Sequence, residues 1–398
     1  MVGLSTVWFL QQRGVAVTVV ERTRVASGSS WGNAGWLTPG RVTPLPDPAV
    51  LSYGLRAVLS PSSPVYVPPS PDPRLLSFLF GFVRNATPAR WRRAMDALVP
   101  VNRMALEAFD ELAEQGVRAP THAAEPFLAV FRTEQERRRL LDELAHLRAH
   151  GQGVDHDVLD GAATRALTPL LTEAVGAGLV LHGQRYLTPS SFVAELASTL
   201  VQRGAVLREG TPVRPGDLVP TAPGVRVGAE EYDAVVVAAG AWTGPLVRRF
   251  GVRQQVRAGR GYSFTVPVEH PVPGPLYLPR QRVACTPDGE RLRIAGMMEF
   301  RPADAPMDPR RISAVVEAVR PLLRGAGLDE RRDEWVGSRP CTVDGLPLVG
   351  ATRHPRVFVA GGHGMWGMTL GPVTGRLLAE QVTSGRRPAE LGPFDPLR

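Results

Sequence analysis

One arginine near the C-terminus is the clearest candidate for chemistry in this sequence. Arg339 lies in a turn-rich segment, with Pro340 directly after it and Asp344-Gly345 a few residues further on. A guanidinium group binds a carboxylate through two parallel hydrogen bonds, so an arginine in this setting suits an anionic substrate. A structural arginine that pairs with Asp344 is the alternative, and the sequence leaves both interpretations open.

A glycine-rich loop follows the arginine segment. The strand-like residues 357–360 lead into this loop, an apolar-periodic helix comes after it, and the loop contains Gly361, Gly362, Gly364 and Gly367. Strand, loop and helix N-terminus together direct free backbone N–H groups toward one point. The pattern therefore predicts a site in which the backbone holds a polar or anionic ligand edge.

The first thirty residues have the pattern of half a dinucleotide-binding unit. Residues 4–13 are expected to form a helix, and residues 15–20 a buried strand that ends at Glu21. In such units an acidic residue at this place binds the ribose hydroxyls. Gly3 takes the place of the third glycine of the phosphate loop, whereas the first strand and the two earlier glycines have no counterpart in the sequence. We therefore expect that translation starts upstream of Met1, and that nucleotide binding is weak if it does not.

Two further stretches fit a nucleotide-binding domain. Residues 26–37 combine small residues with Asn33 between two tryptophans, which permits close backbone contact with a ligand. Residues 232–243 are very apolar and end in small residues, a composition typical of a parallel strand buried on both faces. Both stretches therefore indicate backbone packed close to a bound ligand or to a sheet.

Together, these motifs resemble those of the FAD-dependent D-amino acid oxidase superfamily, most closely its D-amino acid dehydrogenase branch. The resemblance is carried by Arg339-Pro with Asp344-Gly-Leu-Pro-Leu-Val-Gly, by Gly362-His-Gly-Met, by Ser30-Trp-Gly-Asn-Ala-Gly and by Val235-Val-Val-Ala-Ala-Gly-Ala-Trp. These motifs lie at the start, in the middle and at the end of the chain, so the resemblance covers most of one domain.

The fold that the resemblance implies is an α/β protein with two domains. The first is an FAD domain with the two-dinucleotide-binding fold, Rossmann-like but without its first strand, formed by residues 1–45, 175–253 and 333–398. The second is an α+β substrate domain with an antiparallel sheet, formed by residues 46–174 and 254–332. Alternating polar and apolar residues after position 254 are typical of such a sheet.

The resemblance also implies non-covalent FAD and a set of site residues. Arg339 is expected to bind the substrate carboxylate and Tyr262 to orient the substrate, with a half-buried strand tyrosine as the alternative for Tyr262. His363 is expected to contact the isoalloxazine ring through its backbone. Cys341 does not have the spacing to Asp344 that covalent attachment of FAD requires in sarcosine oxidases. The residues expected to bind FAD are Gly3, Glu21, Arg22, Ser29, Ser30, Asn33, Ala34, Gly35, Ala239, Gly240, Gly362, His363, Gly364, Met365, Gly367, Met368 and Thr369.

The activity that the resemblance implies is oxidative deamination of a D-amino acid. Hydride transfer from Cα to flavin N5 gives the imino acid, and the electrons pass to a quinone or another carrier. The sequence has no lysine, which weighs against an oxidase that activates oxygen with one. Two alternatives remain: an oxygen-using oxidase of the glycine or sarcosine type, and a flavin-free, truncated pseudoenzyme.

Composition narrows the remaining classes of function. All 46 basic residues are arginines scattered along the chain, so the net charge of +8 predicts an anion-attracting surface but no nucleic-acid partner. Cys285 and Cys341 lack metal-ligand spacing, so neither a metal site nor a disulfide framework is expected. The sequence has no signal-peptide pattern and no apolar run of membrane-spanning length, which favours a cytoplasmic enzyme.

One apolar run, residues 75–83, has basic flanks and is too short to span a bilayer. A helix of this kind docks on a membrane surface or belongs to the core. Peripheral contact with the inner face of the membrane is therefore one expectation, and a core helix is the other. Dense prolines in residues 38–73 predict an irregular excursion before this run.

Overall fold

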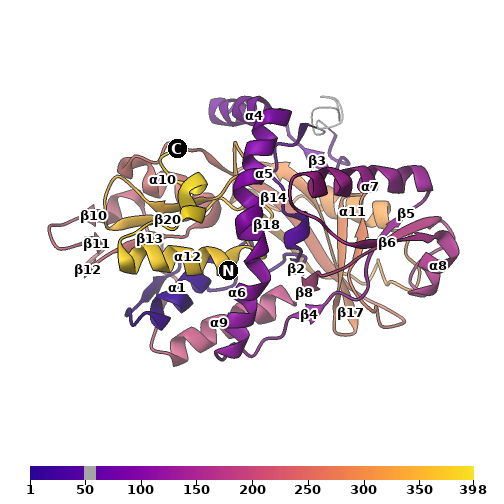
Figure 1. Cartoon of the computed structure of the whole chain (residues 1–398), viewed down its shortest axis with the longest axis horizontal. Coiled ribbons are helices and arrows are strands. Elements are labelled where there is room, and N and C mark those ends of the chain that lie inside the picture. Colours follow the sequence, from indigo (N-terminus) through magenta and orange to yellow (C-terminus); the bar gives the residue numbers. More distant parts are fainter. Residues whose placement is uncertain (49–59) are drawn as a thin grey trace.

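The computed structural model of the protein describes residues 1–48 and 60–398 and has a mixed α/β architecture (Figure 1). Its largest element is a nine-stranded, mostly antiparallel sheet, and smaller sheets carry the N- and C-terminal segments. The described part of the predicted excursion at residues 38–73 contains a 3-10 turn (Pro39–Arg41) and the short strand β3 (Val65–Tyr66). Residues 49–59 of that excursion lie outside the described residues.

The parallel strands of the nucleotide-binding half lie in two separate sheets. Strand β1 (Thr18–Val20) pairs in parallel with β9 (Val206–Arg208). Strand β13 (Val235–Val237) pairs in parallel with β20 (Val357–Gly361), and β19 (Leu348–Ala351) pairs antiparallel with β20. Within the described residues β1 and β13 do not pair with each other. This separation fits the prediction of a nucleotide-binding unit without its first strand.

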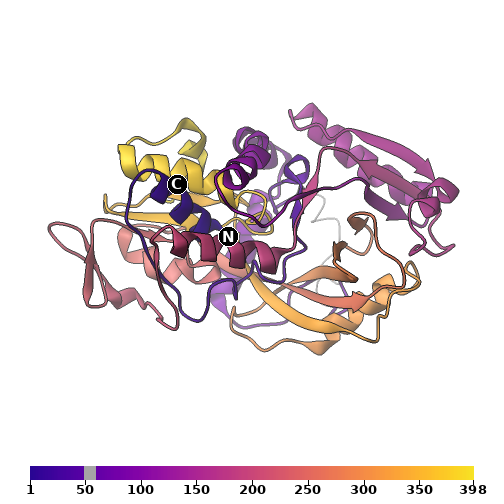
Figure 2. The ribbon, with the colours of Figure 1, turned by 90° about the horizontal axis from the view of Figure 1, so that it is seen from below.

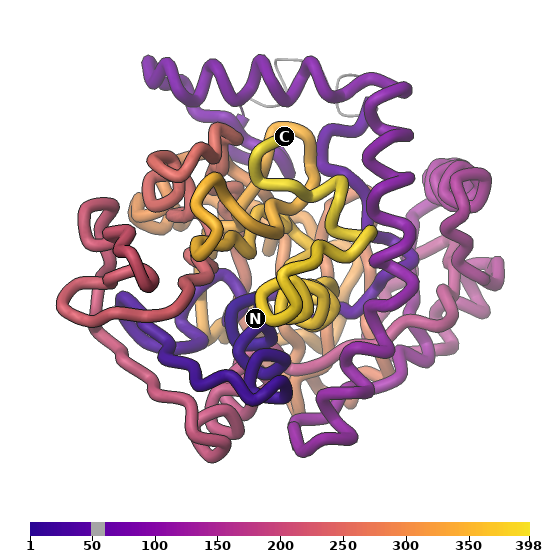
Figure 3. The backbone as a smooth tube through the Cα atoms, turned by 60° about the vertical axis from the view of Figure 1, so that its left-hand side comes forward, coloured from indigo at the N-terminus to yellow at the C-terminus, as the bar shows by residue number. Residues whose placement is uncertain are grey.

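Helices from the two ends of the chain pack against each other. Helix α1 (Val2–Gln12) lies beside α12 (Gly371–Ser384), and Figure 3 shows the indigo and yellow segments side by side. The approach is close because Gly375 of α12 has no side chain: a Cβ there would lie 2.5 Å from the backbone carbon of Ser5. Helix α9 (Pro189–Gln202) shares a hydrophobic core with α1. The chain ends therefore form one structural unit.

The large sheet forms the other part of the molecule, on the right in Figures 1 and 2. Its strands β14 (Val256–Pro267), β17 (Arg291–Phe300) and β18 (Arg332–Thr342) pair antiparallel, with β14 in the middle. Helix α11 (Pro309–Val319) packs on the face of β14 and β17 that forms the main hydrophobic core. Beyond β17 the sheet continues through β16 (Val283–Asp288), β15 (Leu276–Leu278), β5 (Phe127–Phe131), β7 (Ala177–Leu181) and β6 (His156–Asp160).

The remaining elements connect these two parts. Helices α4, α5 and α6 follow one another along one side of the molecule (Figure 1), and α7 packs on β5 and β7. Strands β10, β11 and β12 form a small antiparallel sheet, and β2, β8 and β4 form another. Their bounds are α4 (Pro73–Asn85), α5 (Pro88–Arg103), α6 (Ala105–Glu114), α7 (Glu134–Ala149), α8 (Gly161–Ala166), α10 (Thr243–Val247), β2 (Trp36–Leu37), β4 (His122–Ala123), β8 (Arg185–Tyr186), β10 (Leu218–Pro220), β11 (Val225–Val227) and β12 (Glu230–Tyr232).

The sheet membership differs from the predicted domain boundaries at two places. Strands β7 and β18 belong to the large sheet, whereas residues 175–253 and 333–398 were expected in the FAD domain. Sequence patterns mark where a strand lies but not which sheet it joins, because pairing partners are distant in sequence. The division into two domains itself stays a prediction.

The contact between α1 and α12 gives a testable expectation for stability. A Gly375→Ala substitution places a methyl group against the α1 backbone, so the helices must separate, and we expect a loss of about 1–3 kcal/mol in the free energy of unfolding. Chemical denaturation measures this loss. Gly216→Ala is the matched control, since no atom lies within 4 Å of a Cβ at Gly216. Equal stability of the two variants would contradict the tight contact.

Candidate functional site

The two faces of strand β18 separate the core from the candidate site. Side chains alternate along a strand, so Trp335, Gly337, Arg339 and Cys341 share one face, whereas Val336 lies on the other. Val336 packs against the main hydrophobic core. The face that carries Arg339 therefore points away from that core.

Both predicted flavin loops reach the Arg339 face of β18. At one end the ring of Trp335 packs on Gly32, where a Cβ would lie 2.2 Å from the ring. At the other end Cys341 forms an isolated β-bridge with His363, and the amide of Gly364 donates to the carbonyl of Pro340 at 2.8 Å. Arg339 thus lies along β18 between an N-terminal and a C-terminal loop that are more than 300 residues apart in sequence.

Hydrogen bonds fix the N-terminal loop to both parts of the molecule. The side chain of Asn33 accepts from the amide of Gly35 at 2.8 Å, and the hydroxyl of Thr286 in β16 donates to the carbonyl of Ala34 at 2.6 Å. The hydroxyl of Thr369, in the C-terminal loop, donates to the carbonyl of Trp36 at 3.1 Å. The structure therefore places Thr369 beside the segment that contains Asn33, Ala34 and Gly35, and their common role in binding stays a prediction.

The C-terminal loop has unused hydrogen-bond donors. Among the described residues, the amides of Met365, Gly367 and Met368 have no acceptor. Gly364 adopts φ +55° with no atom within 4 Å of a Cβ, so the space beside it is open. Unpaired N–H groups ahead of α12, together with the helix dipole, favour a polar or anionic ligand edge. This arrangement fits the pyrimidine edge of a flavin.

Arg339 has no carboxylate partner within residues 1–48 and 60–398. It is half-buried, its Nη1 donates to the carbonyl of Met297 at 2.9 Å, and no Asp or Glu among the described residues lies within ion-pair distance of it. Asp344 pairs instead with Arg398 at 2.9 Å, so the alternative of an Arg339–Asp344 pair is wrong. Burial lowers the pKa of the Arg339 guanidinium from its ordinary value, but arginine stays charged at neutral pH. The site therefore holds an unneutralised cation.

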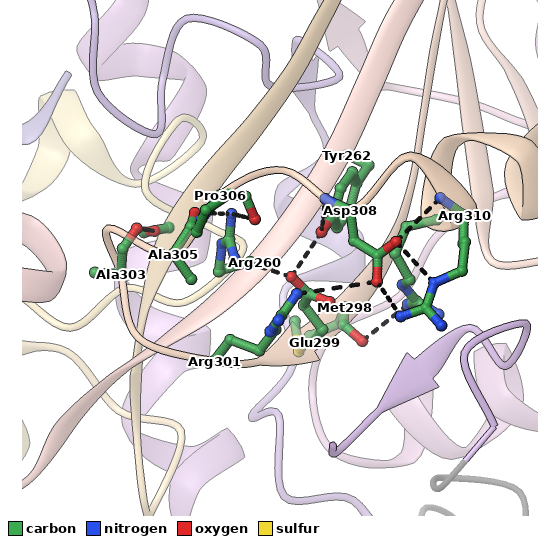
Figure 4. A network of polar contacts seen from close by, with 12 residues as sticks. Arg260, Tyr262, Met298, Glu299, Arg301, Ala303, Ala305, Pro306, Asp308 and Arg310 are labelled. Carbon is green, nitrogen blue, oxygen red and sulfur yellow. Dashed lines mark hydrogen bonds and ion pairs between the residues drawn. The ribbon is translucent and has the colours of Figure 1, made fainter. Parts of the chain in front are cut away.

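Tyr262 lies on the opposite face of the sheet from Arg339. Its register partner on β18 is Val336, and its side chain is 1% exposed within the main core. Its hydroxyl donates to the carboxylate of Glu299 at 2.6 Å (Figure 4), and burial raises the pKa of the Tyr262 hydroxyl, which keeps it protonated. The geometry does not support the prediction that Tyr262 orients the substrate; it supports the alternative of a strand tyrosine, here fully buried.

The residues at the ribose end form a second group. Gly3 packs closely on the residue that follows β13, since a Cβ at Gly3 would lie 3.1 Å from the Cβ of Ala238. Its role as the third glycine of the unit stays a prediction. Glu21 directly follows β1, and its carboxylate accepts from the amide of Thr23 at 3.0 Å. Ala239 and Gly240 lie two and three residues after the end of β13, where a 3-10 turn (Gly240–Trp242) begins.

Arg22 and the two serines lie around this group. The guanidinium of Arg22 stacks 3.7 Å from the ring of Trp242 and pairs with Asp304 at 3.0 Å, so it contacts the large-sheet part of the molecule. The hydroxyl of Ser30 accepts from the amine of Met1 at 3.3 Å, and Ser29 is half-buried next to it. Their roles in FAD binding stay predictions.

His363 is buried and neutral. Its side chain is 3% exposed and its Nε2 lies 2.9 Å from the hydroxyl of Thr374. Burial lowers the pKa of His363 from its ordinary value near 6.5 to about 3. A buried histidine with so low a pKa is a weak base, and its Nε2 is bonded to a helix residue, which favours a backbone role for this loop.

Several residues of the site escaped the sequence analysis. Gly261 lies beneath the Arg339 guanidinium, Met297 provides the carbonyl that Arg339 contacts, and the ring of Trp335 lies between Gly32 and Gly337. Two sequence features could have pointed to them: the glycines at alternate positions of β14 and the Trp335-Val-Gly337 spacing. No sequence feature could have indicated the φ of +65° at Met297, because methionine does not favour the left-handed region.

A glycine-rich loop before a helix, a parallel ribose-binding unit and a cation on the adjoining sheet define a flavin-dependent oxidoreductase. Residues 1–381 match the family described as DAO, FAD dependent oxidoreductase. Over 403 aligned residues the chain is 32% identical to the D-amino acid dehydrogenase of Methylobacterium radiotolerans, covering 98% of this chain and 94% of that protein. The chain therefore belongs to the DAO family of FAD-dependent oxidoreductases.

Solved structures confirm the predicted fold class. Glycine oxidase from Geobacillus kaustophilus superposes with a TM-score of 0.76 at 23% identity, covering 100% of this chain and 96% of that chain. L-α-glycerophosphate oxidase from Mycoplasma pneumoniae, solved with FAD bound, gives a TM-score of 0.72 at 16% identity, covering 96% of this chain and 92% of that chain. Within residues 1–48 and 60–398, no helix has the length and apolar character needed to cross a membrane.

The buried, neutral His363 predicts a pH dependence of stability. Its folded-state pKa of about 3 lies below its ordinary value near 6.5, so the unfolded chain binds the proton first as pH falls. The contribution of His363 to the free energy of unfolding is constant above pH 6.5. Between pH 6.5 and 3 this contribution decreases by on the order of 1 kcal/mol per pH unit. We expect His363→Gln to reduce the loss of thermal stability between pH 7.5 and 5.

The control for this measurement is His270→Gln, because His270 is exposed. The control variant should lose stability on acidification as the parent protein does. If His363→Gln also follows the parent protein, His363 does not stay neutral in the folded state.

Proposed function

We propose that this enzyme oxidises the C–N bond of a D-amino acid to the imino acid, with Arg339 binding the substrate carboxylate. One observation carries the proposal: an arginine without a carboxylate partner lies on the sheet face between the two predicted flavin loops. A bidentate guanidinium–carboxylate pair would neutralise this cation and orient the substrate. The similarity to a D-amino acid dehydrogenase over nearly the whole chain supports the substrate class.

The protein residues contribute binding, orientation and exclusion of water. Bound FAD supplies the two-electron acceptor for the hydride from Cα, while the substrate nitrogen releases a proton and the imino acid forms. Arg339 holds the carboxylate so that one Cα–H bond is directed at the acceptor. Trp335 and the segment at residues 32–35 cover the adjoining surface and reduce access of water. No acid–base role falls to His363.

The cofactor is proposed to be non-covalent. Cys341 lies next to the C-terminal loop but is 1% exposed, and burial raises the pKa of its thiol to about 12. A thiolate is the nucleophilic form of cysteine, so this thiol is poorly suited to forming a bond to FAD. The residues proposed to hold the flavin are the loop amides of Met365, Gly367 and Met368 and the small residues of the N-terminal loop.

The electron acceptor is proposed to be a membrane quinone, and helix α4 the surface through which the enzyme contacts the bilayer. Leu76, Phe80 and Val83 of α4 form one stripe and are 56%, 72% and 50% exposed. Arg74 and Arg84, both exposed, lie near the two ends of the helix. An apolar stripe between cations, on a chain of net charge +8, suits an anionic phospholipid surface. Figure 1 shows α4 at the outer edge of the molecule.

The proposed reaction is tested by anaerobic titration of the flavin-loaded protein with D-alanine and, separately, with L-alanine. We expect the visible flavin absorbance to bleach only with the D-enantiomer, because a fixed carboxylate lets only one Cα–H bond face the ring. Acid precipitation should release the flavin into the supernatant. Bleaching by L-alanine alone, or by N-methylglycine but by no D-amino acid, would overturn the substrate assignment.

Reoxidation of the reduced enzyme distinguishes the dehydrogenase from the oxidase alternative. We expect slow peroxide formation in air and fast reoxidation by a soluble quinone. Fast peroxide release with no acceleration by quinone would favour the oxygen-using oxidase.

The role of α4 is tested by sedimentation with vesicles that contain phosphatidylglycerol. Phe80→Asp places a charge in the centre of the exposed stripe and should reduce vesicle binding about tenfold or more. The variant loses an aromatic ring that would be buried in the bilayer, and it gains a negative charge that the anionic phospholipid repels. Val158→Asp on β6 is the matched control, because Val158 is 53% exposed and lies outside the stripe. Equal binding of both variants would exclude α4 as the contact.

A further inference from the structure

We propose that Gly261 and the carbonyl of Met297 set the position of the Arg339 guanidinium, and that a buried charge network on the opposite face of the sheet holds this arrangement in place. The inference rests on the proposed role of Arg339 in binding the substrate carboxylate. It assigns positioning functions to residues that do not touch the substrate, and it links the two faces of the large sheet.

Gly261 provides the surface on which the guanidinium lies. A Cβ at Gly261 would be 2.1 Å from Nη2, 2.2 Å from Cζ and 2.6 Å from Nη1 of Arg339. All three atoms belong to the planar group, so any side chain at this position would displace the guanidinium as a whole. Gly261 has no positive φ that would require glycine. The requirement for glycine is therefore the space that Arg339 occupies.

Met297 provides the contact that fixes the guanidinium in its plane. The pairing of β14 with β17 shifts between Arg260 and Tyr262, so Met297 and Met298 both lie opposite Gly261 in a β-bulge. Met297 adopts φ +65°, in the left-handed region that methionine rarely enters. In this conformation its carbonyl accepts from Nη1 of Arg339 at 2.9 Å.

The chemistry of this contact matters for binding. A carbonyl is an uncharged acceptor, so it orients the guanidinium without neutralising it. A carboxylate at the same place would compete directly with the substrate carboxylate. The bulge therefore holds Arg339 in one orientation and leaves its charge available, and the remaining N–H groups stay free for an anion.

Groups on the other side of the bulge hold its strained backbone. The amide of Met298 donates to the carbonyl of Pro64 at 2.7 Å, and its carbonyl accepts from Nη2 of Arg311 at 3.2 Å. The carboxylate of Glu299 accepts from Tyr262 at 2.6 Å and pairs with Arg260 at 3.1 Å (Figure 4). The side chains of Arg260 and Glu299 are at most 1% exposed.

This network also attaches the neighbouring loop. Arg260 donates to the carbonyl of Ala305 at 2.6 Å, and the hydroxyl of Ser338 donates to the carbonyl of Ala303 at 2.8 Å. Strained backbone persists where the surroundings over-determine it. Bonds from strand, loop and helix hold Met298 and Glu299, the two residues that follow Met297, so Tyr262 acts on the substrate site indirectly, through Glu299 and the bulge.

The test measures binding of benzoate, a carboxylate that cannot be oxidised, to flavin-loaded variants by calorimetry, together with KM and kcat for D-alanine. We expect Gly261→Ala to raise both the Kd for benzoate and the KM for D-alanine about tenfold or more, with a smaller effect on kcat. The reason is that a displaced Arg339 guanidinium binds the carboxylate less tightly. In an Arg339→Ala background the added methyl group meets no guanidinium. The Gly261→Ala substitution should then change the Kd little.

A second variant separates positioning from folding. Met297→Gly keeps the carbonyl and removes the left-handed strain, but it also deletes a side chain that is 5% exposed in the main hydrophobic core, so we expect lower thermal stability together with unchanged benzoate binding. Tyr262→Phe removes a bond to Glu299 and should raise the Kd although Tyr262 does not face the site.

The outcomes distinguish this inference from the proposed function. If Arg339→Ala binds benzoate as tightly as the wild type, the proposed role of Arg339 in binding the substrate carboxylate is overturned. Loss of binding in Arg339→Ala combined with wild-type binding in Gly261→Ala would overturn the positioning role. An equal loss from Gly261→Ala in both backgrounds would show a general structural defect and would also overturn it.

Discussion

The antiparallel pairing of β14 with β18 is the constraint on which the site depends. Because side chains alternate, this one pairing places Tyr262 and Val336 in the core and puts Gly261, Gly337 and Arg339 on the opposite face. A shift of one residue in register would exchange the two sets and bury the cation in the main core. Helix α11 and the large apolar cluster beneath it therefore fix not only the sheet but also the direction of the Arg339 side chain.

The second requirement is that distant segments converge on this face. The loop after β1 and the loop after β20 come from opposite ends of the chain, and the packing of α1 on α12 brings them together. Contacts of Trp335 with Gly32 and of Pro340 with Gly364 then attach each loop to β18. The proposed flavin site thus lies between two parts of the fold, with backbone donors on one side and a cation on the other.

Burial of charge in this protein is selective. Arg260 and Glu299 are fully buried and paired, and each also bonds to a further polar group. Nε of Arg260 and Oε2 of Glu299 have no hydrogen-bond partner among the described residues. Arg339 has only a carbonyl, so its charge remains uncompensated within the described residues. A half-buried cation without a counterion is less stable than one in water, and a bound anion would offset that cost. Arg260 and Arg339 lie on neighbouring, paired strands, and this contrast separates an arginine of the scaffold from the arginine of the proposed site.

The sequence by itself determined the class of fold, the family motifs and most local elements, because helix periodicity, capping residues and apolar strand runs are properties of short segments. It predicted α1, the strand that ends before Glu21 and the glycine loop, and it singled out Arg339. The tertiary structure decided what depends on distant partners. The pairing of Asp344 with Arg398 left Arg339 free, the register of β14 turned Tyr262 into the core, and a bulge gave Met297 its left-handed backbone. No local pattern encodes these outcomes, because each arises from residues that meet only when the sheet forms.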